Sequence, residues 1–313
     1  MKKNMIILGD VTAHRQHMVQ GGGFPVTRFG LYLVLIVCIF VFQLLTGCTT
    51  LKLTPVASPP TEVYHQGKFV WHDLLTSDVA TAKNFYGELF GWSFKKQGRY
   101  TVVLNKGQPI GGIIEVQPKD GKKHAARWLA SLSVPDVDKA AALVQKAGGT
   151  LHEGPVDMKN RGRSALVCDP HGAQLLLLHS SVGDPEDKEP PMGSWLWIEL
   201  WTNDPDKAIA FYKELGDYSS VNVEEDYWIL LKDKWRCGVR FTLNEDLGVR
   251  WTPVVRVPDT VSISERVEKL GGQVLIQPED VSIGSGSVAL IEDPAGALLI
   301  VQRWSKQSFS KGD

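Results

Sequence analysis

Two places in this chain combine an aromatic and an acidic residue in a pattern suited to holding a small ligand. Trp71 stands two residues before Asp73, and Trp197 stands two residues before Glu199. Alternate side chains of a strand share one face, so we expect each tryptophan to lie beside its carboxylate. Indole offers a flat stacking surface, and a carboxylate offers oriented, charge-assisted hydrogen bonds. The chemistry indicated is non-covalent recognition of a small polar or aromatic molecule.

An Arg-Trp pair also occurs twice. We expect Arg127 and Arg250 to join these residues, each on the same sheet face as the Trp and the carboxylate of its half. A second interpretation stays open. A carboxylate and a guanidinium on neighbouring strands can simply pair and close a cavity that holds no ligand, because buried ion pairs are weak evidence of function. No Ser-His-Asp order, phosphate-cradling Gly loop or Cys-His pairing stands out, so no catalytic residue is assigned.

The elements that must position these residues occur in an internal duplication. Segments 76–93 and 202–219 align, and Val-Pro-Asp, Gly-Gly and Asp-Pro-x-Gly follow in the same order in each half. Such self-similarity predicts tandem domains, separated by a charged, Pro-rich linker. The expected divisions are a domain of 67–180, a linker of 181–193, a domain of 194–304 and a tail of 305–313.

A smaller repeat lies within each half. An apolar strand leads to an aspartate, such as Asp78 or Asp136, that is suited to cap the amphipathic helix after it. Short strands follow, and then the pattern starts again. The predicted fold class is α+β, with two βαβββ modules in each domain forming a curled mixed or antiparallel sheet with its helices outside.

This order of motifs resembles the vicinal oxygen chelate superfamily, which includes glyoxalase I, bleomycin-resistance proteins and extradiol dioxygenases. The resemblance covers nearly all of 67–304 and implies that each sheet curls into a cup. In the enzymes of that superfamily a divalent metal in the cup binds two vicinal oxygens of the substrate. Such a metal needs His, Glu or Gln at inward positions.

The ligand positions implied by the resemblance hold side chains that do not bind metals. They are Trp71, Leu129 and Leu176 in the first domain, and Trp197, Thr252 and Ile300 in the second. We therefore expect no metal and no other cofactor. His72 neighbours one of these positions, but strand alternation turns it away from the cup and predicts a core or interface histidine.

The N-terminus has the pattern of a bacterial lipoprotein signal. A basic segment precedes the apolar run 31–45, and Leu-Thr-Gly-Cys follows, ending at Cys48. This resembles a lipobox, which implies that 1–47 is removed and that Cys48 carries diacylglycerol. Thr49 implies sorting to the periplasmic face of the outer membrane. An uncleaved membrane anchor is the alternative, and 48–66 is expected to be an extended Pro/Thr/Ser tether.

Composition narrows the function further. Lys and Arg number 34 against 35 Asp and Glu, so no basic excess indicates a nucleic-acid partner. We expect a lipid-anchored, non-enzymatic protein that binds a small ligand or a partner, with its two domains paired as an intramolecular pseudo-dimer and the cleft between them as the binding surface. The alternative is a metal-dependent glyoxalase, lyase or dioxygenase-like enzyme that uses displaced ligands.

Overall fold

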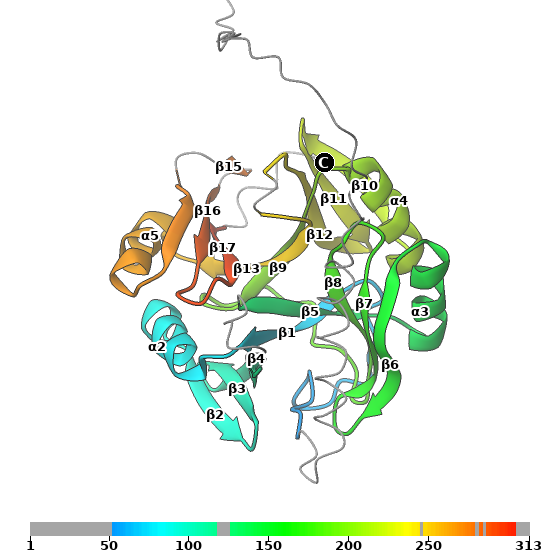
Figure 1. Cartoon of the computed structure of the whole chain (residues 1–313), viewed down its shortest axis with the longest axis horizontal. Helices are drawn as coiled ribbons and strands as arrows, with labels where there is room; N and C mark the ends of the chain where they lie inside the picture. The colour runs from blue at the N-terminus through cyan, green and yellow to red at the C-terminus, as the bar shows by residue number, and fades with distance from the viewer. Residues whose placement is uncertain (1–51, 118–125, 245–246, 279–281, 284–285, 305–313) are drawn as a thin grey trace, which may run out of the picture.

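Two curled mixed sheets, each with two helices, form the body of the protein (Figure 1). The computed structural model describes residues 52–117, 126–244, 247–278, 282–283 and 286–304. The expected signal segment and Cys48 lie outside these residues. No helix in the described ranges is long and apolar enough to cross a bilayer.

The first sheet has eight strands in the order β2-β3-β4-β1-β5-β8-β7-β6. Its strands β1 and β5 are antiparallel neighbours at the centre, while β4 runs parallel to β1 and β8 runs parallel to β5. The elements are β1 (Phe69–Thr76), α2 (Val79–Phe90), β2 (Ser93–Gln97), β3 (Tyr100–Asn105), β4 (Gln108–Glu115), β5 (Arg127–Ser133), α3 (Val137–Lys146), β6 (Thr150–Met158), β7 (Gly162–Cys168) and β8 (Gln174–Ser180).

The second sheet repeats this plan with nine strands in the order β10-β11-β12-β9-β13-β17-β16-β14, and the short β15 pairs with β16. The predicted βαβββ modules are therefore confirmed in both halves. The elements are β9 (Trp195–Thr202), α4 (Pro205–Gly216), β10 (Ser219–Glu224), β11 (Tyr227–Lys232), β12 (Lys234–Phe241), β13 (Arg250–Val257), α5 (Thr260–Lys269), β14 (Gln273–Ile276), β15 (Ser282–Ile283), β16 (Gly286–Glu292) and β17 (Leu298–Arg303).

Each helix begins at an aspartate whose side chain accepts a hydrogen bond from the first turn. Asp78 accepts from the amide of Thr81 at 2.9 Å, and Asp136 accepts from that of Lys139 at 3.0 Å. These bonds satisfy amides that have no partner within the helix. Asp204 and Asp259 cap α4 and α5 in the same way.

Of the strands in the first module, β2 has the weakest signal in the sequence. It is an edge strand, paired only with β3, and none of its residues is buried. Phe94 packs against the core but is the single apolar residue of β2, so the apolar-polar alternation that marks a half-buried strand is missing there.

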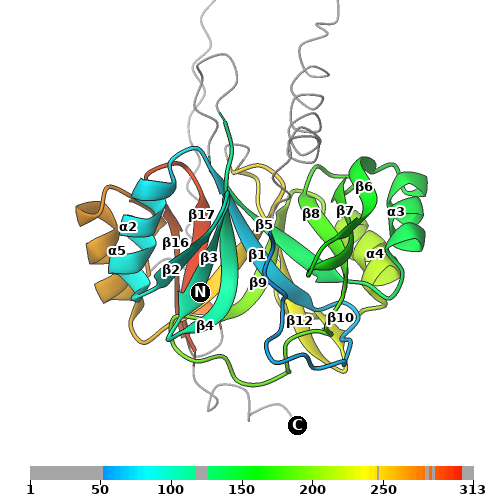
Figure 2. The same ribbon diagram turned by 90° about the horizontal axis from the view of Figure 1, so that it is seen from below.

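The helices pack crosswise between the two halves. Helix α2 of the first half lies beside α5 of the second, and α3 lies beside α4, as Figures 1 and 2 both show. One apolar core contains Phe85 of α2 and Val267 of α5, and another contains Val144 of α3 and Tyr212 of α4. Each half therefore completes its core with residues of the other.

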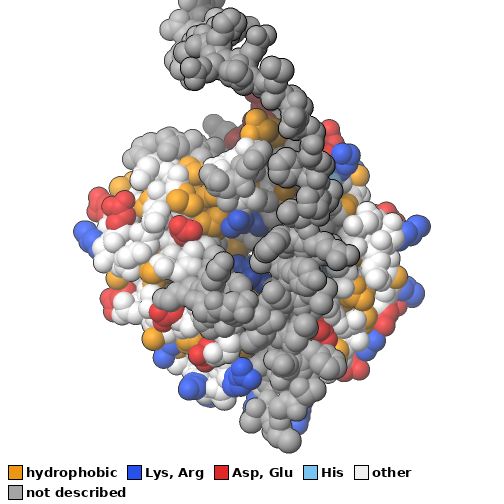
Figure 3. Space-filling model, in the orientation of Figure 1, with side chains coloured by type: hydrophobic (Ala, Val, Ile, Leu, Met, Phe, Trp, Pro, Cys, Tyr) orange, Lys and Arg blue, Asp and Glu red, His pale blue; other side chains and the backbone are white. Residues whose placement is uncertain are grey.

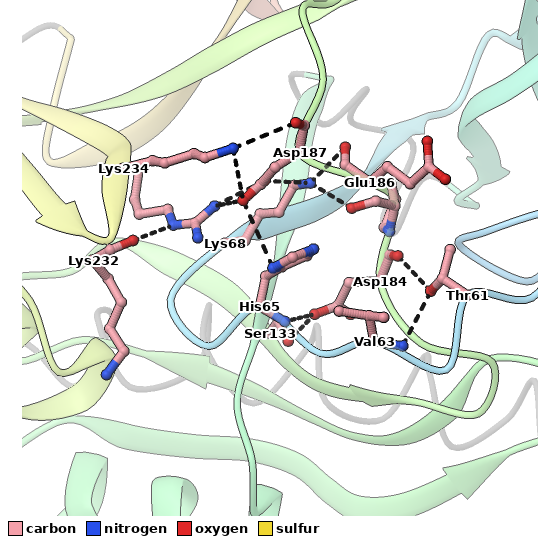
Figure 4. Close-up of polar contacts among 12 residues, drawn as sticks. Thr61, Val63, His65, Lys68, Ser133, Asp184, Glu186, Asp187, Lys232 and Lys234 are labelled. Atoms are coloured by element: carbon pink, nitrogen blue, oxygen red, sulfur yellow. Dashed lines mark hydrogen bonds and ion pairs between the residues drawn. The ribbon is translucent and has the colours of Figure 1, made fainter.

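The linker between the halves is held in place by ion pairs and hydrogen bonds (Figure 4). Asp184 is fully buried and accepts from the Ser133 hydroxyl at 2.6 Å and from the His65 amide at 2.7 Å. Asp187 lies 2.9 Å from Lys68 and 2.9 Å from Arg236. Burial raises the pKa of Asp187, but its bonds to Lys68 and Arg236 outweigh this and leave the pKa lowered. Through Asp184 and Asp187 the charged linker is thus bonded to residues of both halves.

Candidate functional site

A closed polar cluster occupies the concave face of the first sheet. Asp73 accepts from the Trp71 indole Nε1 at 3.0 Å and from the Tyr100 hydroxyl at 2.6 Å. Arg161, from the turn between β6 and β7, donates to that hydroxyl at 3.1 Å and lies 3.5 Å from Asp73. Its guanidinium sits 4.5 Å from the centre of the Trp71 ring. Burial, followed by the charge of Asp73, raises the pKa of Tyr100 far above its ordinary value. The carboxylate and guanidinium of this cup satisfy each other.

The chain's own N-terminal segment covers this cluster. Leu53 packs with Tyr100, and Val56 packs with Trp71. The Nε of Arg161 donates to the carbonyl of Thr54 at 2.9 Å. In Figure 1 this blue segment lies between β4 and β6. Residues 48–66 are predicted as an extended tether, but from residue 52 onward they fold over the first cup, because Leu53 and Val56 gain burial there.

The second concave face repeats the carboxylate but not the closure. Glu199 is buried and accepts from the Tyr227 hydroxyl at 2.8 Å and from Arg240 Nε at 3.3 Å. Within the described ranges, four buried donor atoms on this face make no hydrogen bond: Nε1 of Trp197, Nε1 of Trp201, Oγ1 of Thr252 and one Nη of Arg240. Buried polar groups are normally paired, so the second cup has spare hydrogen-bonding capacity.

The side chains at the predicted ligand positions do not fit the divalent metal of the resembled enzymes. Trp71 pairs across the sheet with Ser131, which pairs in turn with Leu176. In the second sheet Trp197 pairs with Val254, and Val254 pairs in turn with Ile300. The inward carboxylates are held by Tyr and Arg, and the described residues contain no group of three or more His, Cys, Asp or Glu side chains able to hold a metal.

Arg127 and Arg250 do not join the carboxylates of the cups. The guanidinium beside Asp73 is that of Arg161, and the one beside Glu199 is that of Arg240. Both predicted arginines instead line a cleft of about 350 Å³ between the halves, at the starts of β5 and β13. Leu129 and Thr252 line the same cleft, so it adjoins the rims of both cups.

The repeated motifs form reciprocal bonds across the two halves. Tyr86 of α2 donates to Asp293 at 2.9 Å, and Tyr212 of α4 donates to Asp169 at 2.8 Å. Burial, with the nearby carboxylate second, raises the pKa of both tyrosines well above the ordinary value. These four residues belong to the Phe-Tyr and Asp-Pro-x-Gly motifs, so the duplicated sequence encodes the interface.

His72 faces away from the cup, as strand alternation predicts. It is buried against Trp195 of the second half, with ring centres 4.5 Å apart. Neither ring nitrogen has a hydrogen-bond partner among the residues described, and burial lowers the pKa of this imidazole to about 3. His72 is therefore a neutral interface residue at physiological pH.

Sequence reasoning missed four residues that complete the two polar clusters: Tyr100, Arg161, Tyr227 and Arg240. The tyrosines each begin the third strand of the first module in their half, so the duplication offered a signal for them. The arginines offered none, because Arg161 comes from a turn and Arg240 from a strand. Only the fold shows which arginine reaches each carboxylate.

Comparison with known proteins agrees with this geometry. The profile of the glyoxalase/bleomycin resistance protein/dioxygenase superfamily matches residues 68–177. The chain is 30% identical over 254 residues to the anthracycline biosynthesis protein DauV of Streptomyces sp. strain C5, covering 74% of this chain and 91% of DauV. It is 27% identical over 260 residues to CFP32 of Mycobacterium tuberculosis, named as a glyoxylase, covering 80% of this chain and 99% of CFP32.

Solved structures show the same fold at low sequence identity. A Mn(II)-bound glyoxalase from Novosphingobium aromaticivorans aligns with a TM-score of 0.56 at 12% identity, covering 77% of this chain and 83% of that one. The 2,3-dioxygenase LapB from Pseudomonas aligns with a TM-score of 0.55 at 12% identity, covering 77% and 94%. With its fold, its repeated motifs and these relatives, the chain belongs to the glyoxalase/bleomycin resistance protein/dioxygenase superfamily.

Proposed function

We propose that this protein binds a small molecule in the cleft between its two halves and performs no metal-dependent chemistry. The observation that carries the proposal is the cleft itself, about 350 Å³ in volume and walled by equivalent segments of both halves. That volume lies within the range of small-molecule sites, which favour boundaries between domains. The relatives are named for glyoxylase activity and for anthracycline biosynthesis, so a small organic ligand accords with both names.

The state of the two cups supports the cleft over either cup alone. The first cup is filled by the Trp71–Asp73–Tyr100–Arg161 cluster and covered by the N-terminal segment. The second cup keeps unpaired donors, and Thr252 is both one of these and part of the cleft wall. A ligand in the cleft can therefore reach into the second cup but not into the first.

The apolar residues at the ligand positions support a non-enzymatic role. A Lewis-acid mechanism requires several donor side chains around one ion, and Trp71, Leu176 and Ile300 supply none. Elemental analysis of the mildly purified protein addresses this directly. We expect substoichiometric Zn, Ni, Fe and Mn, whereas one equivalent of any of them would contradict a metal-free function.

A ligand screen against a cleft-filled variant tests the binding proposal. Gln174→Trp places an indole in the cleft wall, and Gln145→Trp places one on the exposed face of α3 as the matched control. We expect thermal-shift screening to find small organic molecules that stabilise the parent protein and the control but not Gln174→Trp. If stabilisation survives in Gln174→Trp, or if no small molecule raises the Tm, the cleft is not a binding site.

We further propose that a lipid on Cys48 holds this body close to a membrane. Leu53 is already buried against the first sheet, only five residues after Cys48. Even a fully extended segment of that length spans roughly 18 Å, so little free tether remains. Mass spectrometry of the mature N-terminus should show a diacylglycerol adduct that Cys48→Ser removes. An unmodified Cys48, or an intact residue 1, would contradict lipid anchoring.

A further inference from the structure

The two arginines in the cleft occupy equivalent places in the two halves. Arg127 begins β5 and Arg250 begins β13, and each is followed by a tryptophan that bonds to a tyrosine of its own half. Trp128 donates to Tyr86 at 3.1 Å, and Trp251 donates to Tyr212 at 2.8 Å. Because both tryptophans are buried and hydrogen-bonded, they fix the strand backbone from which each arginine enters the cleft.

Neither arginine has a hydrogen bond or an ion pair to another described residue. The Nε atoms of Arg127 and Arg250 are buried without a hydrogen-bond partner in the described part of the chain. Burial lowers the pKa of both guanidinium groups, and for Arg250 the nearby Glu292 partly offsets this. Both arginines are only partly buried, and their guanidinium groups bond to no described residue, so an anionic ligand in the cleft can pair with both.

The rest of the cleft is neutral. Its other lining side chains are the uncharged polar groups of Gln174 and Thr252 and those of apolar or small residues such as Val249 and Leu298. Burial, and then the charge of Arg127, lower the pKa of the nearby His152, which favours its neutral form. Figure 3, which labels no residues, shows blue Lys or Arg atoms near the middle of the face in view.

We propose that the cleft binds a small dianion, such as a phosphate monoester or a dicarboxylate, with one arginine contributed by each half. Arginine forms bidentate, charge-assisted hydrogen bonds with both phosphate and carboxylate groups. Two equivalent guanidinium groups facing one cleft match a ligand that carries two negative charges, with one ligand bound per chain. This inference rests on the cleft being the binding site and specifies the class of ligand.

Titration calorimetry with inorganic phosphate, on the full chain in a nonionic detergent, tests the inference. At mildly alkaline pH phosphate is mainly a dianion, and sodium chloride keeps the ionic strength constant. We expect one phosphate per chain, weakened about tenfold by Arg127→Gln or Arg250→Gln and abolished in the double variant. Arg99→Gln, at an exposed arginine, should bind phosphate unchanged. Succinate should bind more tightly than acetate.

The stability of the ligand-free variants provides a second measurement. Replacing a partly buried guanidinium that bonds to no described residue should leave the Tm unchanged or raise it, whereas replacing a structural arginine would lower it. A lower Tm in both single variants, or phosphate binding that survives in the double variant, would overturn the proposal. If phosphate has no effect but a neutral ligand is lost in Gln174→Trp, the cleft remains the site and only the dianion is excluded.

Discussion

At the scale of single residues, the first cup is held together by a buried ion pair with every group bonded. Asp73 and Arg161 are each almost completely buried, and Tyr100 and Trp71 bond to the same carboxylate. Such a pair contributes little net stability, but removing one partner leaves the other as an uncompensated buried charge. The cluster is therefore sensitive to single substitutions.

Asp73→Asn should destabilise the protein strongly. The amide keeps the shape of the side chain but leaves the Arg161 charge unpaired, so we expect the free energy of unfolding to fall by about 3–5 kcal/mol. Urea unfolding followed by tryptophan fluorescence measures this. Asp138→Asn, which breaks the exposed pair with Arg163, is the matched control and should change stability little. Equal effects of the two substitutions would show that the buried cluster is not coupled.

His72 should make the stability of the protein depend on pH. In the folded protein its pKa is about 3, while in the unfolded chain it returns to 6.5, so the unfolded chain binds the extra proton between these values. The contribution of His72 to the free energy of unfolding should therefore be fully present above pH 6.5. It should be lost as the pH drops toward 3, by on the order of 4–5 kcal/mol. His72→Phe should flatten this part of the curve, and parallel curves for the two proteins would count against the assignment.

At the scale of elements, the N-terminal segment acts as a structural cover. It supplies Leu53 and Val56 to the first cup and the Thr54 carbonyl to Arg161, while Val63 further along it is 51% exposed. The contribution of this segment to the free energy of unfolding should therefore come from a few buried side chains.

Leu53→Ala should cost about 2–3 kcal/mol of unfolding free energy, because it leaves a cavity beside Tyr100. Val63→Ala in the same segment should have almost no effect, because that side chain is already in solvent. Chemical denaturation measures both, and proteolysis near residue 53 should become faster only in Leu53→Ala. If Leu53→Ala lowered the free energy of unfolding no more than Val63→Ala does, the segment would not close the cup.

At the scale of the whole molecule, the two halves pack against each other along their helices. Their helices complete each other's cores, and Tyr86 and Tyr212 reach across to the Asp-Pro-x-Gly turns of the opposite half. Asp169 and Asp293 also accept amide bonds within their own turns, so each aspartate links a local turn to the interface.

Tyr86→Phe and Tyr212→Phe should each lower the unfolding free energy by about 1–3 kcal/mol, since each leaves a buried indole donor and carboxylate short of a partner. Differential scanning calorimetry of the single and double variants measures the loss. In the double variant the single transition should broaden or split as the halves uncouple. Tyr64→Phe, which alters an exposed phenol, is the control. If Tyr86→Phe and Tyr212→Phe changed the free energy of unfolding no more than this control does, the hydrogen bonds between the halves would be refuted.

The sequence alone determined the modules, because the information is local and repeated. Aspartate caps, helical spacing around Phe85 and the turn at Asp169 each depend on a few adjacent residues, and the second half repeats them. Strand alternation also placed Asp73 and Glu199 inward and His72 outward. What escaped was the edge strand β2, whose single apolar residue, Phe94, is too little to form an alternating pattern.

Only the tertiary structure decided which partners these residues meet. Asp73 could pair with any arginine within reach, and the curl of the sheet brings Arg161 to it while Arg127 lies in the cleft. The N-terminal segment looked like a spacer because its burial depends on a surface formed by residues far along the chain. Long-range proximity follows from how curled sheets and crossed helices pack, and no short sequence pattern encodes it.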